Sequence, residues 1–356
     1  MSRAALLPLA TTACLFGASM SLAQPSEPLT IAAQGSFAVG GTVAQTPGMF
    51  QNNAPTVEGQ SFHGDHLYAF YQVPPDARPL PIVMLHGAYQ SGRSWESTPD
   101  GREGFQTLFL RRGFPVYVVD QPRRGRAGNS TVAATIEPTP YDQLFFDQFR
   151  IGQWPDYFEG VQFDRSPEAL EQFFRSVTPN TGDYDAGLVA DGMSALIDRI
   201  GPSILFTHSQ GGGPGWLTAI QNDDVRGIVA FEPGSGFVFP EGEAPEPMPS
   251  AAGTLSPETV PMEDFQKLTR MPIVIYYGDN IPTEPTAERG KDNWRVRLAM
   301  ARLWVEAVNR HGGDATLVHL PEVGITGNTH FMFSDLNNVE IADQVSTFLE
   351  EKGLDK

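Results

Sequence analysis

"SILFTHSQGGGPGW", residues Ser203–Trp216, joins a short apolar run to a turn rich in glycine. The run has no alternating polar residues, which is typical of a strand covered on both faces of a sheet. Ser209 lies at the end of the run, and the small residues after it allow a sharp turn into a helix. The stretch therefore predicts a buried strand, a tight turn that carries a serine, and a helix.

Four other short segments repeat the same apolar pattern, which predicts further buried strands. They are "PIVMLHG" (81–87), "PVYVVD" (115–120), "GIVAFEPG" (227–234) and "PIVIYYGD" (272–279). Apolar residues at helical spacing fill 189–200 and stop at Gly201-Pro202. Buried strands that alternate with helices predict an α/β fold with a mostly parallel central sheet and helices on both faces. Short runs between 29 and 73, broken by Gly, Pro and Asn, predict antiparallel strands at one edge.

Two segments interrupt this alternation. Ten aromatic residues lie between Tyr141 and Phe174, in a stretch too long for a simple connection, so we expect a lid insertion at about 137–181. Six prolines between about 237 and 262 predict an irregular surface loop. The length of 356 residues and the 40% hydrophobic content predict that residues 24–356 otherwise form one domain.

The first residues predict export. Arg3 precedes an apolar run that ends in the small residues Ser21 and Ala23, a pattern typical of a signal peptide at 1–23 that is cleaved after Ala23. A membrane anchor is the alternative, but Thr, Ser and Gly interrupt the run. We therefore expect a secreted or periplasmic protein. Cys14 is the only cysteine, so the mature chain would contain none.

Charge restricts the partners. The formal net charge is -18, which disfavours binding to nucleic acid and to anionic membrane surfaces and favours a neutral or weakly charged small molecule. His63 and His66 in "HGDH" raise the question of a metal site, but no third ligand has a clear spacing, so a polar turn is the favoured interpretation. No metal and no cofactor are expected, and the sequence does not indicate an oligomeric state.

Ser209 is the candidate nucleophile. A serine on a strand-to-helix turn usually lies in G-x-S-x-G, and here Thr207 replaces the first glycine while Gly211 keeps the second. The competing interpretations are a loop that merely packs helix on strand, or a phosphate cradle, which would need a lysine. The expected base is His330, which follows the strand-like "ATLVHL" and precedes a helix predicted at 339–349. A loop histidine with only local hydrogen bonds is the alternative.

Two carboxylates follow strands in the chain order that a catalytic acid requires: Glu232 in "VAFEPG" and Asp279 in "YYGDN". From position alone both remain candidates. The loop after the strand at 81–87 is expected to supply one backbone N–H to an oxyanion, from Ala88 or, less favoured, Tyr89. The residue after the nucleophile, Gln210, would supply the other.

Four stretches of the sequence resemble a known family: residues 86–130, "THSQGG", "FEPG" and "GNTHFMF". Together they resemble a family of exported bacterial esterases in the α/β-hydrolase superfamily, over nearly all of residues 80–350. The resemblance implies Ser209 as nucleophile, His330 as base and Glu232 as acid, after the sixth strand. It favours Glu232 over Asp279. Known members have two adjacent cysteines after His-Gly, and Ala88-Tyr89 stands there in this chain.

These observations predict a secreted serine hydrolase that cleaves small carboxylic esters through an acyl-enzyme. The same triad could serve a lactonase, an amidase or a perhydrolase. A non-catalytic binding protein on the same scaffold is the alternative from another class, but no triad member is missing. Tyr89, Trp154 and Phe158 are candidates to contact the substrate. The aromatic residues of the lid could equally form the core of the lid itself.

Overall fold

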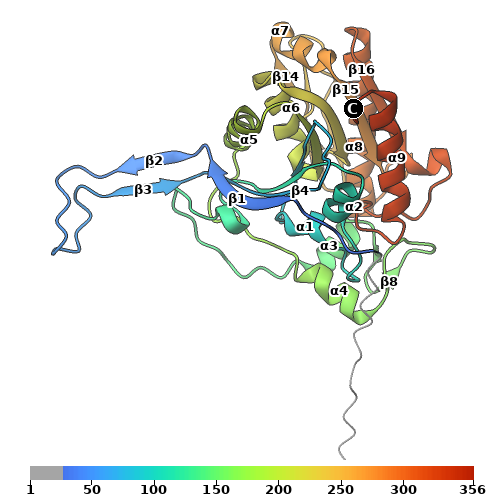
Figure 1. The fold of residues 1–356 in the computed structure, drawn as a ribbon. Helices are drawn as coiled ribbons and strands as arrows, with labels where there is room; N and C mark the ends of the chain where they lie inside the picture. The colour runs from blue at the N-terminus through green and yellow to red at the C-terminus, as the bar shows by residue number, and fades with distance from the viewer. Residues whose placement is uncertain (1–26) are drawn as a thin grey trace, which may run out of the picture.

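The computed structural model describes residues 27–356, so the signal peptide predicted at 1–23 lies outside the described residues. An eight-stranded sheet crosses the molecule (Figure 1). Its strands, in order across the sheet, are β1 (Ala33–Val39), β4 (Leu67–Val73), β6 (Val116–Asp120), β5 (Ile82–Leu85), β9 (Ser203–His208), β10 (Val225–Phe231), β15 (Pro272–Tyr277) and β16 (Asp314–His319). β1 and β4 are antiparallel to their neighbours and the other strands are parallel, which confirms the predicted α/β sheet and its antiparallel edge.

Helices cover both faces of the sheet, because the parallel strands are apolar on both sides. One face packs against α5 (Ala186–Ile200), α6 (Gly212–Gln221) and α8 (Arg289–Arg310). The other packs against α1 (Arg93–Glu96), α2 (Phe105–Arg111) and α9 (Asn338–Glu351). Shorter helical pieces are α7 (Met262–Phe265) and the 3-10 turns η1 (Gly125–Ala127), η2 (Ser209–Gly211), η3 (Gln266–Arg270) and η4 (Leu320–Val323).

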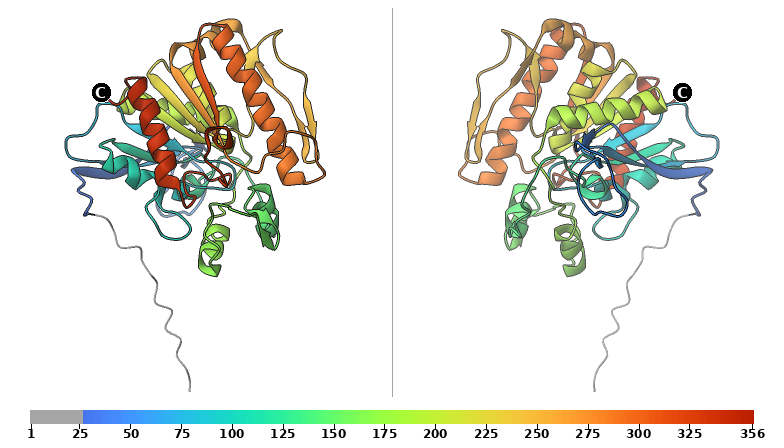
Figure 2. Two further views of the ribbon diagram at one scale, coloured as in Figure 1. Left: turned by 90° about the vertical axis from the view of Figure 1, so that its right-hand side faces the viewer. Right: turned by 90° about the vertical axis from the view of Figure 1, so that its left-hand side faces the viewer.

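The aromatic segment forms its own small unit at the carboxyl ends of the strands. It contains α3 (Asp142–Gln148), a two-stranded ribbon of β7 (Gly152–Gln153) and β8 (Asp156–Tyr157), and α4 (Pro167–Phe174). Its helices are green in Figure 2 and lie below the sheet. Six apolar side chains of this segment form a separate buried cluster: Phe145, Phe146, Ile151, Val161, Phe163 and Phe173. Most of the aromatic residues therefore pack on one another.

The proline-rich segment is more regular than the sequence predicts. It contains β11 (Val238–Pro240), β12 (Met248–Ser250), β13 (Gly253–Leu255) and β14 (Glu258–Val260), paired as β11 with β14 and β12 with β13. Prolines keep these strands short, since proline cannot donate a ladder hydrogen bond. Val238 and Phe239 are buried in the core, and Trp304 Nε1 donates to the Val238 carbonyl oxygen at 2.8 Å.

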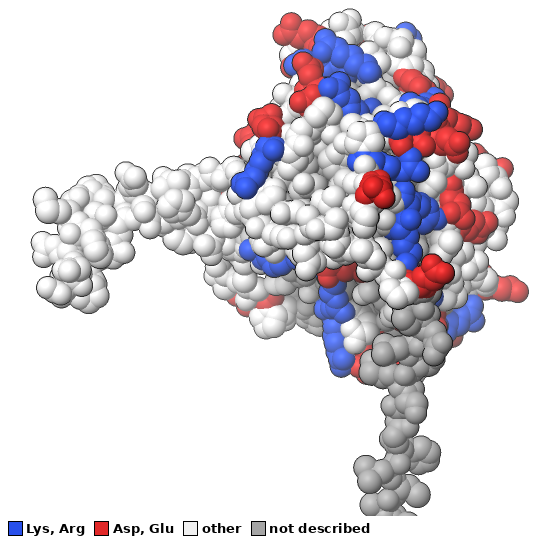
Figure 3. Space-filling view, viewed as in Figure 1, with Lys and Arg blue, Asp and Glu red and all other residues white. Residues whose placement is uncertain are grey.

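A second ribbon, β2 (Thr42–Gln45) with β3 (Ser61–Gly64), projects away from the body (Figure 1). The face of the ribbon seen in Figure 3 carries no charged side chain, whereas acidic and basic side chains are scattered over the body. Its apolar side chains, including Met49 and Phe50, are exposed. Over residues 27–356, no helix is both long enough and apolar enough to span a bilayer.

Candidate active site

Ser209 occupies a strained turn directly after β9. Its φ is +53°, a left-handed conformation that non-glycine residues adopt mainly where the surroundings enforce it, as at functional turns. The turn needs small neighbours: a Cβ on Gly211 would lie 2.8 Å from the His86 carbonyl oxygen. Thr207 fits in place of the usual first glycine because it faces Gly215 of α6, where a Cβ would lie 2.7 Å from Thr207 Cγ2. The residue that must be glycine at this contact is therefore Gly215 in the helix, not the residue at position 207 in the strand.

His330 and Glu232 form a buried pair beside this turn. The distance from His330 Nδ1 to Glu232 Oε2 is 2.6 Å, and both side chains are fully buried. Glu232 follows β10 in a left-handed conformation with φ +46°, and the Gly234 N–H donates to the Ser209 carbonyl oxygen at 2.9 Å. The structure therefore brings the turn of Ser209 and the turn of Glu232 into direct contact.

The other nitrogen of His330 remains available. In the part of the chain that the structure describes, His330 Nε2 is buried and has no hydrogen-bond partner. The ring is held by stacking on Phe149, with centroids 4.9 Å apart and an angle of 12°, and by Trp294 at 4.1 Å. Its backbone carbonyl accepts a hydrogen bond from His208 Nε2 at 3.0 Å, and its N–H donates to the Phe149 carbonyl oxygen at 3.0 Å. Catalytic contacts often shorten only when substrate binds.

Arg150 is the unexpected member of the site. It is fully buried, its Nη2 bonds Glu232 Oε1, and its Nε donates to the Asp279 carbonyl oxygen at 2.7 Å. The Gly278 N–H also donates to Glu232 Oε1, at 2.7 Å. Burial alone would raise the pKa of Glu232, but the charge of Arg150 and the hydrogen bond from His330 outweigh it, so the pKa lies below its usual value. The carboxylate is ionised and fixed in orientation.

The protonation of His330 follows from the same neighbours. Burial is the largest influence, and the positive charges of Arg150 and Arg297 act in the same direction, while Glu232 opposes them. The pKa of His330 is lowered to about 4. The imidazole is therefore neutral over most of the pH range, which is the form that accepts a proton.

The loop after β5 approaches the turn of Ser209 as predicted. A Cβ on Gly87 would lie 2.7 Å from Ser209 Cβ. Arg124 holds this loop and the turn together: its Nη1 donates to the Gly87 carbonyl oxygen at 2.7 Å, and its Nη2 lies 3.4 Å from Gln210 Oε1. Burial lowers the pKa of Arg124 to about 10, so its charge is retained at neutral pH. Arg124 thereby links the residue before Ala88 to Gln210.

His86, in the same loop, has a structural role. Its Nδ1 lies 2.9 Å from the Gly87 carbonyl oxygen, and its Nε2 accepts a hydrogen bond from the Gln121 N–H at 3.1 Å. Burial lowers the pKa of His86 to about 3, so the ring is neutral. Both ring nitrogens are used, which leaves His330 as the histidine with an available nitrogen beside Ser209.

Asp279 does not reach His330. Its Oδ1 accepts the Asn280 N–H at 2.6 Å and its Oδ2 accepts the Gly327 N–H at 2.7 Å. It fixes the loop that leads to His330. Asp335 acts in the same way, because its carboxylate accepts hydrogen bonds from the N–H and the hydroxyl of Thr329, both at 2.7 Å. These carboxylates hold residues 327–329, directly before His330.

A narrow space, here called the inner cleft, opens beside the loop after β5 that contains Ala88 and Tyr89. Its lining residues are Ala88, Tyr89, Gln90, Phe145, Phe149, Phe173, Ser176, Val177 and Phe331. Tyr89 is thus placed at the site. Trp154 and Phe158 are not: Trp154 packs on Phe146 with ring centroids 5.3 Å apart, and Phe158 lies 4.5 Å below Lys291 Nζ. Neither residue lines the inner cleft, so their contact with substrate stays a prediction.

The residues that sequence reasoning missed are Arg150, Arg124, Phe149 and Trp294. Arg150 is separated by 82 positions from the carboxylate that it bonds, and nothing in its neighbourhood marks it as buried. Arg124 lies in a stretch that carries the family resemblance, which was the available signal. Within residues 27–356, no group of three His, Cys, Asp or Glu side chains is arranged to hold a metal ion.

Known proteins place this site in context. A solved bacterial esterase is 28% identical and covers 92% of this chain and 98% of its own, with a TM-score of 0.73. The probable secreted lipase phiG of a fungus (Fungal sp., strain ATCC 74256) is 28% identical over 331 residues, which is 83% of this chain and 88% of the lipase. The model of the alpha/beta hydrolase family matches residues 82–335, well over half of the chain. The chain therefore belongs to the alpha/beta hydrolase family and is of the esterase and lipase type.

Proposed function

We propose that this protein is an exported serine hydrolase that cleaves carboxylic esters through an acyl-enzyme, with Ser209, His330 and Glu232 as its triad. The observation that carries the proposal is the buried pair of His330 and Glu232, which, among residues 27–356, leaves His330 Nε2 without a partner beside the turn of Ser209. The names of the similar proteins, an esterase and a secreted lipase, agree with this chemistry.

The geometry supports a sequence of steps. His330 Nε2 takes the proton of Ser209 as its Oγ attacks the ester carbonyl, and Glu232 stabilises the imidazolium that forms. The N–H groups of Ala88 and Gln210 hold the oxyanion, and Arg124 fixes the segments that carry them. His330 then protonates the leaving alcohol. A water molecule, activated by the same nitrogen, releases the acid and restores the serine.

The test is a series of 4-nitrophenyl esters of increasing acyl length, offered to the purified mature protein. Turnover that follows saturation kinetics with at least one acyl length supports the proposal. A properly folded protein that hydrolyses none of these esters above the background rate contradicts it.

The pH dependence of kcat/KM offers a second test, which also examines the role of Arg150. Because His330 must be neutral to act as base, kcat/KM should be constant at neutral pH and fall in acid with an apparent pKa of about 4. Three charged groups act on the ring: Glu232 raises its pKa, while Arg150 and Arg297 lower it. Removing Arg150 removes one positive charge. In Arg150→Met the acid limb should therefore move upward by about one pH unit.

Arg150→Lys is the matched control, since it keeps the charge and changes the shape. Its acid limb should stay near that of the wild type, even where kcat falls because Glu232 is less well oriented. An acid limb that is unchanged in Arg150→Met, or that moves equally in both variants, would show that Arg150 has only a structural role.

Export gives a further expected result. If the chain is cleaved after Ala23, mature protein recovered from the periplasm or medium begins at Gln24 and contains no thiol, because Cys14 is the only cysteine. Intact mass and thiol titration measure both points. Recovery of an exported chain that retains Cys14 would overturn this cleavage site.

A further inference from the structure

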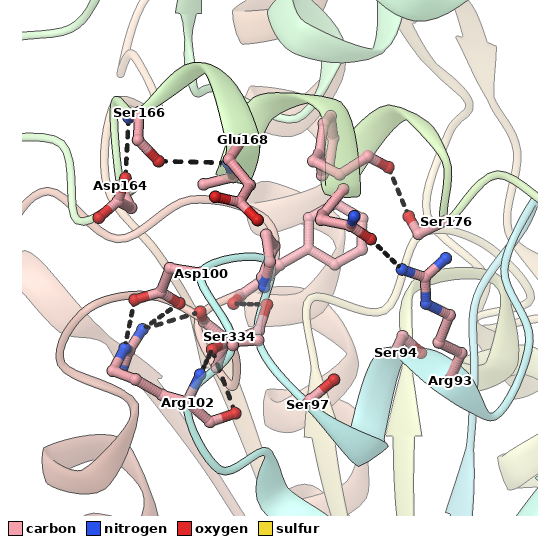
Figure 4. Close-up of a pocket in the computed structure, with 17 residues that line it drawn as sticks. Arg93, Ser94, Ser97, Asp100, Arg102, Asp164, Ser166, Glu168, Ser176 and Ser334 are labelled. Atoms are coloured by element: carbon pink, nitrogen blue, oxygen red, sulfur yellow. Dashed lines mark hydrogen bonds and ion pairs between the residues drawn. The ribbon is translucent and has the colours of Figure 1, made fainter. Parts of the chain in front are cut away.

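A cavity of about 720 Å³ lies next to the inner cleft, between α4 and the segment that contains α1. We call it the outer chamber (Figure 4). It is lined by α1 and the following loop to Arg102, by parts of 164–176 around α4, and by Phe331 and Ser334. Its volume lies within the usual range of ligand pockets, about 300–1,000 Å³. It is therefore large enough for a six-membered ring with substituents.

The chamber adjoins the inner cleft, which lies beside the loop after β5. Phe173, Ser176 and Phe331 line both the outer chamber and the inner cleft, which begins at Ala88. Phe331 directly follows His330 in the chain. Because His330 would protonate the leaving alcohol, the alcohol portion of an ester must lie on the side of His330. The outer chamber reaches that side through Phe331, whose ring packs against the His330 ring with centroids 5.2 Å apart.

The lining is polar, unlike that of a pocket for an alkyl chain. Six hydroxyl side chains contribute to it: Ser94, Ser97, Thr98, Ser166, Ser176 and Ser334. All of these except Ser97 already form one hydrogen bond or more with the neighbouring backbone, which leaves oxygen lone pairs for a ligand. Gln172 and five charged side chains add further donors and acceptors, and the aromatic rings are confined to the end shared with the inner cleft. An alkyl group here would remove water from the exposed charged side chains of the lining, such as Glu168, and give them nothing in exchange. A ligand with many hydroxyl groups would satisfy both donors and acceptors.

The charges of the chamber are nearly balanced. Arg102 is committed to Asp100, at 2.5 Å, and to the Asp335 carbonyl oxygen, at 3.0 Å. Arg93 donates to Gln172 Oε1 at 2.7 Å and so ties α1 to α4. Among the hydrogen bonds and ion pairs of residues 27–356, the Glu168 side chain has none, and Figure 4 shows its carboxylate on the side of α4 that faces Asp100 and Ser334. A neutral ligand fits this balance better than an ion.

We propose that the outer chamber binds the alcohol portion of the substrate and that this portion is a neutral polyhydroxylated group, a sugar or a polyol. The inference rests on the proposed function, since it assumes an ester cleaved at Ser209. Glu168 and Gln172 would accept and donate hydrogen bonds to the hydroxyl groups, while Phe331 and Phe173 bound the passage to the inner cleft.

The experiment compares esters that share one acyl group. Wild-type kcat/KM is measured with 6-O-butyrylglucose, hexyl butyrate, butyrylcholine and 4-nitrophenyl butyrate. We expect the glucose ester to exceed the hexyl and choline esters by about tenfold or more, since each satisfied polar group adds to discrimination. The double variant Glu168→Ala/Gln172→Ala should lower kcat/KM for the glucose ester by about tenfold, mainly through KM, and should lower it less for 4-nitrophenyl butyrate, whose alcohol portion has no further hydroxyl groups for these side chains to bind.

Glu171→Ala is the matched control, because Glu171 lies on the same helix but outside the chamber, in an exposed ion pair with Arg175. It should leave all four esters unchanged. A wild-type preference for hexyl butyrate or butyrylcholine overturns the inference, as does a double variant that affects every ester equally. If 4-nitrophenyl butyrate is hydrolysed only when Ser209 is present but the glucose ester is not preferred, the inference fails and the proposed function stands. If no 4-nitrophenyl ester of any acyl length is hydrolysed, the proposed function itself fails.

Discussion

Replacing Ser209 with alanine should lower kcat for nitrophenyl esters by on the order of 10⁴-fold or more, because it removes the atom that forms the acyl-enzyme. The fold should survive. Serine and alanine carry a similar strain at φ +53°, and the turn is held by neighbouring contacts, such as the Gly234 N–H to the Ser209 carbonyl oxygen, that do not use the hydroxyl. Residual hydrolysis from the oxyanion donors alone is expected to remain above the uncatalysed rate.

Ser235→Ala is the matched control, because Ser235 is an exposed serine a few residues beyond Glu232. It should keep wild-type turnover. Circular dichroism and the melting temperature of both variants establish that the fold is intact. A folded Ser209→Ala protein with wild-type rates would show that another group is the nucleophile.

The fold was predictable from the sequence where strands are buried on both faces of the sheet. β5, β6, β9, β10 and β15 are short apolar runs covered on both faces, and each lies where its run predicts. The proline-rich segment was less predictable. Prolines indicate where strands must stop, but its buried residues are held by contacts with α8, such as the bond from Trp304, which is distant in the sequence. The projecting ribbon of β2 and β3 also gave no signal beyond its turn residues.

The site was predictable at the residues that follow strands, because parallel strands bring their carboxyl ends to one edge. Ser209 and Glu232 lie at such positions, and the structure pairs His330 with Glu232. Arg150 was not predictable, since it comes from the lid and its burial depends on the Glu232 carboxylate that it bonds. The exchange of a glycine for Thr207 is explained only once Gly215 is seen opposite it.

The second large effect concerns the acid. Glu232→Gln should lower kcat by about 10³ to 10⁴-fold, because an amide neither fixes the imidazole tautomer nor stabilises the imidazolium. It should also cost stability, by about 3–5 kcal/mol, because Arg150 would be left buried without a carboxylate. Activity must therefore be measured well below the melting temperature. Asp279→Asn should lower kcat by less than about tenfold, since the side chain only accepts hydrogen bonds from the backbone of its own loop and of the loop before His330.

A double variant separates the two effects of Glu232→Gln. Adding Arg150→Met removes the unpaired charge, so part of the lost stability should return, whereas turnover should stay as low as in the single variant. Recovery of stability without recovery of rate would show that Glu232 acts on the chemistry and Arg150 acts through Glu232. If Asp279→Asn instead abolishes turnover while Glu232→Gln retains it, the acid is Asp279, and the loop between it and His330 must rearrange when substrate binds.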